Sequence, residues 1–269
     1  MKYSEFKRRT LEHLSDYKEK QLGITDSGKW KTVSCPHILP EKQMSANLLP
    51  MVKLPRIKVH SGACHLNSSQ MMCVNFFEPL IHDVSGKRIL RRILSECTGI
   101  SFDSDVKRAE FEYIPHEGGE NTNFDFFLEF ADGGKIYFEI KYTEECFGGV
   151  DKALQKKGVY STLWRNLYNA RCNDSLYLSG ISEEEFYSEY QIYRIMTYIR
   201  TTQDYAFFVY PFGNDNLKNQ FAVSRGAKCP NVRALCWSEL SQVALKVTED
   251  TEYYTHFRMF SEKYIWNWK

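Results

Sequence analysis

Two acidic residues and a lysine lie close together in the middle of the chain. Asp125 precedes a glycine-containing turn, and Glu139 and Lys141 follow it. Carboxylate oxygens are ligands that Mg²⁺ prefers, and bound Mg²⁺ polarises a phosphoryl oxygen and lowers the pKa of its water. A neighbouring ammonium group can orient that water or stabilise transition-state charge. The three residues could therefore hydrolyse a phosphodiester with Mg²⁺, or with Mn²⁺ in its place. The alternative interpretation is a surface hairpin with an ordinary Glu–Lys pair.

The stretch 122–144 predicts a β-hairpin that would position these residues. Two runs rich in Phe, Ile and Tyr flank the turn at residues 131–134, where glycine allows a positive φ. Because side chains alternate between the faces of a strand, Glu139 and Lys141 share one face of the second run. In the first run, the face opposite Asp125 is expected to carry Phe124, Phe126, Leu128 and Phe130.

The register of the hairpin decides whether the charged residues meet. A three-residue loop at 132–134 pairs Ala131 with Lys135 and places Asp125 opposite Lys141, with Glu139 on the diagonal. A slip by one residue would move Asp125 to the other face. Glycine in the left-handed conformation is typical of three-residue loops, so we predict this register and a shared face for the three residues.

Asp125 followed by Glu139-Ile140-Lys141 resembles the motif of the PD-(D/E)XK nuclease superfamily. Phe124 stands where that superfamily has a proline, a position that supplies no ligand. The flanking sequence resembles a bacterial branch of restriction endonucleases from about residue 28 to residue 211. The segments that carry this resemblance are 65–70, 75–77, 111–113, 122–125 and 139–144.

The resemblance implies a metal-dependent DNA endonuclease, and we expect a role in restriction or defence. Asp125, Glu139 and Ile140 would be its metal-binding residues, and Lys141 its catalytic lysine. It also implies an α/β fold, a restriction-endonuclease-like mixed β-sheet flanked by helices, with helical additions at both ends. Superfamily members often use one more acid near the sheet. The sequence leaves three candidates for it: Glu78, Glu96 and Glu112.

Composition favours one packed domain over residues 1–269. Hydrophobic residues make up 43% and aromatic residues 15% of the chain, which argues against disorder. The net charge of +1 excludes a strongly basic nucleic-acid binder but allows a local basic cleft. We expect an N-terminal helix and wrapping segment at 1–60, a catalytic core at 61–212 and a C-terminal addition at 213–269.

Cysteine usage and hydropathy predict a cytoplasmic protein with reduced thiols and no membrane partner. The eight cysteines form no C-x-x-C pair, the N-terminus lacks the apolar core of a signal peptide, and no apolar run reaches membrane-spanning length. Five residues suggest a zinc site, but their spacing fits no common pattern, so we favour incidental thiols. They are Cys35, His37, His60, Cys64 and His65.

Periodicity and punctuation predict the remaining elements. Helices are expected at residues 4–22, 67–79, 86–97, 150–168 with a break at Gly158, and 182–200. Strands are expected at 106–114, 205–211 and 232–237, with Ser238 capping the helix that follows. Since a helix precedes 205–211, that strand should pair in parallel with the hairpin. Near the C-terminus, a helix should bury the stripe Tyr253, Phe257, Phe260 and Tyr264.

Two polar groups outside the hairpin are candidate DNA contacts. Ser68, Ser69 and Gln70 either cap a helix or face the phosphate backbone at its N-terminus. Gln191 and Arg194 lie one turn apart and suit a phosphate or base contact, and the alternative is a polar surface.

Two other functions remain open. The first is a DNA-repair or junction-resolving nuclease of the same fold, and the second is a nucleic-acid-binding module without catalysis. A double-strand cut would favour a homodimer. Trp266 and Trp268 offer apolar surface for it, although we expect both to fold back onto their own subunit.

Overall fold

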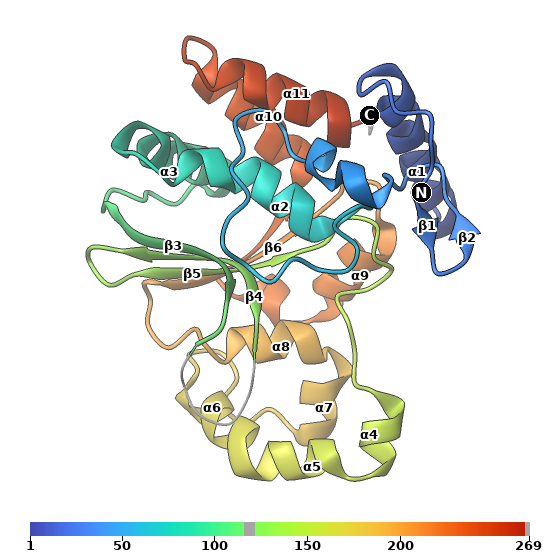
Figure 1. Ribbon diagram of the computed structural model, residues 1–269. Helices are drawn as coiled ribbons and strands as arrows, with labels where there is room; N and C mark the ends of the chain where they lie inside the picture. Colours follow the sequence, from blue (N-terminus) through green and yellow to red (C-terminus); the bar gives the residue numbers. More distant parts are fainter. Residues whose placement is uncertain (116–121, 267–269) are drawn as a thin grey trace.

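The computed structural model describes residues 1–115 and 122–266, and a mixed β-sheet lies at the centre of this described part (Figure 1). Its strand order is β3-β4-β5-β6-β7. The strands β3, β4 and β5 are antiparallel, whereas β6 pairs in parallel with β5 and with β7. The mixed sheet and the parallel pairing predicted from sequence are therefore confirmed. The strand bounds are β3 (Val106–Tyr113), β4 (Phe124–Phe130), β5 (Lys135–Ile140), β6 (Asp204–Tyr210) and β7 (Val232–Cys236).

Helices from both ends of the chain cover one face of the sheet. Apolar side chains from these helices and from the strands form one core cluster that extends from Phe6 to Tyr264. The predicted C-terminal stripe is confirmed, since Phe257, Phe260 and Tyr264 are 0% exposed. The helices of this layer are α1 (Tyr3–Lys20), α2 (Ser69–Phe77), α3 (Val84–Thr98), α10 (Trp237–Thr248) and α11 (Tyr254–Tyr264).

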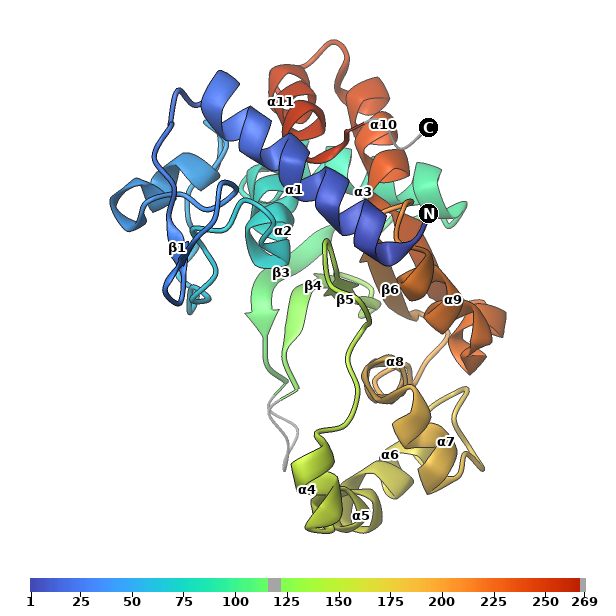
Figure 2. The same cartoon turned by 90° about the vertical axis from the view of Figure 1, so that its right-hand side faces the viewer.

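A second group of helices covers the other face, where an aromatic-rich cluster includes Tyr137 and Phe208 of the sheet. Figure 2 shows these helices below the strands, on the side opposite α10 and α11. The group comprises α4 (Lys152–Lys156), α5 (Val159–Leu163), η3 (Trp164–Tyr168), α6 (Asn169–Asp174), α7 (Glu183–Ser188), α8 (Tyr190–Met196) and α9 (Asp215–Val223). Gly158 separates α4 from α5 with a φ of 70°, as the predicted break required.

The segment between α1 and α2 wraps along the first layer. It contains the short hairpin β1 (Lys29–Trp30) and β2 (Val33–Ser34) and the turn η1 (Glu41–Asn47). Two other short turns are η2 (Glu78–Leu80), which follows α2, and η4 (Arg225–Lys228), which follows α9. No helix within residues 1–115 and 122–266 is long and apolar enough to cross a membrane.

The single helix predicted for residues 182–200 is wrong, because the chain leaves helical geometry at Glu189. Its φ of −127° and ψ of 52° separate α7 from α8. The Glu189 carboxylate accepts a 2.6 Å hydrogen bond from Gln220 of α9, and Glu185 pairs with Arg225. These two contacts tie α7 and its junction with α8 to the α9 region, which local sequence does not reveal.

The prediction that Ser238 caps the helix after the last strand is wrong. Helix α10 begins at Trp237, directly after β7, and Cys236 occupies the N-cap position. The Ser238 hydroxyl instead lies 3.0 Å from the Cys236 sulfur. The helix therefore begins earlier than predicted, at Trp237, which the prediction placed in the strand.

The predicted hairpin register is also wrong, by two residues. Glu129 pairs with Lys135, and Phe126 with Phe138. Ala131 and Lys135 cannot pair as predicted, since their amides donate to Asp105 and Gln203 outside the hairpin. The turn closes instead through a hydrogen bond of 2.8 Å from the Phe130 N–H to the Gly134 carbonyl, with Gly133 at a φ of +91°. Because the shift is an even number, it preserves the faces and carries Asp125 opposite Glu139 rather than Lys141.

The sequence predicted that the apolar residues of β4 share one face, and this prediction is wrong. Phe126, Leu128 and Phe130 belong to the first core cluster, whereas Phe124 packs in the second, with its ring 4.8 Å from Tyr137. The change of face coincides with Glu112 on the neighbouring strand, whose φ of 52° is uncommon for a residue other than glycine. Phe126 pairs with Phe111 and Phe124 with Tyr113, so Asp125 and Glu112 lie between these pairs. The irregularity therefore falls at the two acids.

Candidate active site

Asp125 and Glu139 approach each other where β4 begins and β5 ends. The strand pairing stops at Phe126 and Phe138, and one step further along this register Asp125 faces Glu139. Asp125 Oδ2 accepts a 2.6 Å hydrogen bond from the Ile140 N–H. A residue in a strand directs its N–H and C=O toward the same neighbouring strand. The Ile140 carbonyl therefore points to the same side as its N–H, which is the side of Asp125.

Lys141 joins the two acids at this point. Its Nζ lies 2.6 Å from Glu139 Oε1, and the side chains of Lys141 and Glu139 are only 15% and 5% exposed. Burial by itself lowers the pKa of Lys141, but the attraction of Glu139, Asp125 and Glu144 outweighs it and leaves the pKa above its ordinary value. Lys141 is therefore a cation held among three acidic side chains.

The environment of Asp125 disfavours its negative charge. Burial is the largest cause, and repulsion by Glu139 adds to it, so the pKa of Asp125 is well above its usual range. The positive charge of Lys141 and the hydrogen bond from the Ile140 N–H lower the pKa of Asp125, but by less than burial and repulsion raise it. A divalent cation between the two carboxylates would relieve this repulsion.

Of the three candidate additional acids, Glu112 is the one that lines a groove with Asp125. Its charge acts on Asp125, and its Oε1 accepts a 2.8 Å hydrogen bond from Gln70 Nε2. Asn123 donates to the other oxygen. The two other candidates are engaged elsewhere. Glu78 accepts from the Lys53 N–H and from His82, and Glu96 pairs with Lys246 and Arg92.

Glu144 is a site residue that sequence reasoning did not select. Its Oε1 accepts a 2.6 Å hydrogen bond from Ser69, and its Oε2 accepts one of 2.6 Å from the Tyr142 N–H. The available signal was its position three residues after Lys141, directly beyond the hairpin. That position alone could not show that Glu144 turns back toward the lysine.

The residues at the start of α2 combine the two roles that the sequence left open. Ser68 caps the helix by accepting from the Met71 N–H at 3.3 Å. Ser69 and Gln70 instead hold Glu144 and Glu112, and Gln70 also accepts a hydrogen bond from the His60 N–H. The helix start therefore orients the acids.

Gln191 and Arg194 form a separate polar pair on α8. Arg194 donates a 2.8 Å hydrogen bond to Gln191, and the Arg194 guanidinium lies 5.4 Å from the centre of the Tyr190 ring. The Gln191 side chain packs against Gly148, beyond β5. Their proposed contact with nucleic acid stays a prediction.

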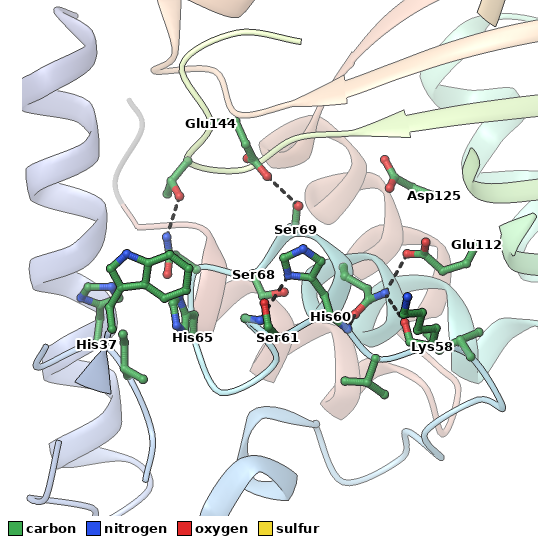
Figure 3. Close-up of a pocket in the computed structure, with 18 of the residues that line it drawn as sticks. His37, Lys58, His60, Ser61, His65, Ser68, Ser69, Glu112, Asp125 and Glu144 are labelled. Atoms are coloured by element: carbon green, nitrogen blue, oxygen red, sulfur yellow. Dashed lines mark hydrogen bonds between the residues drawn. The ribbon is translucent and has the colours of Figure 1, made fainter. Parts of the chain in front are cut away.

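A large groove opens beside the acids. It has a volume of about 1360 Å³ and is lined by Asp125, Glu112 and Glu144 together with residues of α1, β1 and the segment 56–70. Figure 3 shows Asp125 and Glu112 at one end and His37 and His65 at the other, beside α1, with Ser69 and His60 between them. The volume exceeds the ~300–1,000 Å³ of a typical small-molecule site, so the groove can accept part of a macromolecule.

The donor set at the sheet fits Mg²⁺ better than zinc. Asp125 and Glu139 offer oxygen ligands, and the Ile140 carbonyl could add a third, with waters completing the shell. Within the described part of the chain, no group of three or more His, Cys, Asp or Glu side chains is arranged to hold a metal. In the candidate zinc region, His65 makes an edge contact with Trp30, and His60 Nδ1 accepts from the Gly62 N–H.

A comparison with protein families gives one match over nearly the whole chain. The model described as "Restriction Endonuclease associating with ARP" matches residues 11–265. The chain belongs to this family. REase-ARP is thus a restriction-endonuclease family, and the mixed sheet with helices on both faces is the restriction-endonuclease-like α/β fold that the sequence predicted. Comparisons with curated proteins and with solved structures found no match.

Proposed function

We propose that this REase-ARP chain is a metal-dependent DNA endonuclease of restriction or defence, with a site of the PD-(D/E)XK type. One observation carries the proposal: Asp125 and Glu139 come together on adjacent strands, and the ammonium group of Lys141 lies 2.6 Å from Glu139. Membership of a restriction-endonuclease family supports DNA as the substrate.

Each residue has a distinct role in this proposal. Asp125, Glu139 and the Ile140 carbonyl would hold Mg²⁺, which when bound polarises a phosphoryl oxygen and lowers the pKa of its water. Lys141 would orient the attacking water and offset the negative charge that develops on the phosphate. Glu144 and Ser69 would position Lys141, because Glu144 is one of the three acids that hold the lysine in its charged form.

Glu112 would act beside Asp125. Its carboxylate is held by Gln70 and Asn123 and adds negative charge next to the proposed metal site. We assign it a supporting role, either through a metal-bound water or as a charge that strengthens cation binding.

The test is cleavage of supercoiled plasmid and of linear duplex DNA, with Mg²⁺, with Mn²⁺ and with chelator. The wild-type protein should cut only with metal. Glu139→Gln should lower the rate by at least about a hundredfold, the scale for loss of one strong electrostatic interaction in a transition state. Glu129→Gln is the matched control, because Glu129 lies on β4 and pairs with Lys107. Equal cleavage by wild type and Glu139→Gln would remove Glu139 from the mechanism, and no cleavage of any DNA by wild type would contradict the proposal.

A further inference from the structure

The end of the groove remote from the carboxylates carries an exposed aromatic side chain on a fixed support. Trp30 lines the groove and is 49% exposed. Its indole meets the His65 ring edge-to-face at 5.0 Å, and His65 meets His37 in the same manner at 6.3 Å. An exposed indole with fixed neighbours is a suitable surface for a planar ligand.

Backbone contacts hold this support in place. The chain at His37 and the chain at His65 run beside each other, joined by the Leu66 N–H to the His37 carbonyl at 3.1 Å and the Leu39 N–H to the Cys64 carbonyl at 2.9 Å. The buried Asn47 amide also donates to the His65 carbonyl at 2.9 Å. The rings are therefore positioned before any ligand arrives, which reduces the entropy lost on binding.

Charges around the groove suit a phosphate backbone next to the aromatic surface. Lys7, Arg56 and Lys58 line the groove and are exposed. The His37 imidazole, by contrast, carries no charge at neutral pH. Burial and, second, the neighbouring His65 lower the pKa of His37 to about 4, so His37 is neutral at pH 7 and can hydrogen-bond a base without attracting a phosphate. The cations on the rim suit the phosphate of a nucleotide, and the neutral planar groups inside suit its base.

We propose that the groove binds an unpaired DNA segment next to the scissile phosphate, with one base stacked on Trp30. The bases of an intact duplex stack on one another, so an indole can stack only on an unpaired or extruded base. The groove continues from Trp30 to Asp125, which allows one strand to occupy both ends. This inference rests on the proposed nuclease function and defines its substrate class as DNA with a single-stranded overhang, flap or extruded base.

Binding in the absence of metal tests the inference without requiring cleavage. The probes are a fluorescein-labelled single-stranded oligothymidylate and a blunt duplex of the same length, titrated with full-length protein in chelator. Trp30→Ala should weaken single-strand binding by about tenfold, the scale for loss of one base–aromatic stack, and should change blunt-duplex binding by less than about twofold. Trp30→Phe should retain most of the affinity.

Val33→Ala is the matched control, because Val33 pairs with Trp30 in the same hairpin and is 62% exposed. Circular dichroism and thermal unfolding of each variant establish that the hairpin substitutions leave the fold intact. Unchanged single-strand binding by Trp30→Ala, or an equal loss on blunt duplex, would overturn the inference. A Trp30-dependent single-strand binder that cuts no DNA with Mg²⁺ would contradict the nuclease proposal instead, so the two failures are distinguishable.

Discussion

The Asp125 carboxylate accepts a hydrogen bond of 2.6 Å from the backbone N–H of Ile140, the residue between Glu139 and Lys141. This bond lies just beyond the last pair of the β4–β5 ladder, Phe126 with Phe138. A side chain thus continues the connection between the strands where their backbone pairing stops. The bond fixes Asp125 relative to both other residues of the proposed site, because all three then depend on the backbone of one short segment.

We expect stabilisation by Mg²⁺ to increase with pH. The pKa of Asp125 is raised by burial and by Glu139, so Asp125 keeps its proton in the metal-free folded state above the pH at which it ionises in the unfolded chain. The folded state then binds more protons than the unfolded state, and metal-free stability falls as pH rises through this interval. Mg²⁺ requires the ionised carboxylate and therefore competes with the proton.

The measurement is the Tm with MgCl₂ minus the Tm with chelator, from pH 5 to pH 8. The difference should be small at pH 5 and should grow toward pH 8. Asp125→Asn should show a small difference that does not depend on pH. A wild-type difference that is constant over this range would argue against Asp125 as the metal-binding acid.

Lys141→Met should abolish cleavage and leave DNA affinity nearly intact. Loss of the ammonium group should cost at least about a hundredfold in rate. It also leaves Asp125, Glu139 and Glu144 without their shared cation, so the variant should lose about 1–3 kcal/mol of stability at neutral pH and recover part of it with Mg²⁺. Single-turnover cleavage, DNA binding and urea unfolding measure the three effects.

Lys107→Met is the control for this substitution. Lys107 also pairs with a glutamate of the sheet, Glu129, but its side chain is 64% exposed. A surface pair of this kind contributes about 0–1 kcal/mol, so Lys107→Met should change neither cleavage nor stability appreciably. A Lys141→Met protein that cuts at the wild-type rate would show that the lysine has no catalytic role.

Substitutions of Glu112 should separate the stability lost through its left-handed backbone conformation from the effect of its carboxylate on cleavage. The φ of 52° disfavours residues other than glycine by about 1–2 kcal/mol. Glu112→Gly should therefore unfold at a higher Tm than Glu112→Ala, while both lose the carboxylate and cut more slowly. Thermal unfolding and cleavage rates on the same protein preparations compare the two. Wild-type cleavage by both variants would show that the acid is not needed.

Double-strand cleavage predicts a C₂ dimer, because one site cuts one strand. The C-terminal segment does not present Trp266 as a dimer surface. The Trp266 indole donates to Thr10 of its own chain at 3.1 Å, as expected from the sequence, and Trp268 lies outside the described residues. Light scattering over a dilution series, with and without DNA, should show a dimer at least when DNA is bound. A monomer under every condition, with single-strand nicks as the only product, would contradict the dimer.

The sequence by itself determined the α/β fold class, because its signals are local. Alternation predicted β3, the glycine-containing turn predicted the hairpin, and helical spacing predicted the buried stripe of α11. The approach of Asp125 to Glu139 was also predicted, but alternation alone does not produce it. Strand β4 changes face between Phe124 and Phe126, and the Asp125 carboxylate is held by the Ile140 N–H.

Only the tertiary structure decided the details that depend on contacts between distant segments. In the observed register, the amides of Ala131 and Lys135 donate to the backbone carbonyls of Asp105 and Gln203, which lie outside the hairpin. The charge of Glu112 acts on Asp125, and Gln70 of α2 holds the Glu112 carboxylate, whereas Ser69 holds Glu144. The groove joins residues of α1 and β1 to Asp125, more than ninety residues away in sequence. Sequence periodicity records the environment of each residue within its own element, whereas a site depends on how the elements pack against one another.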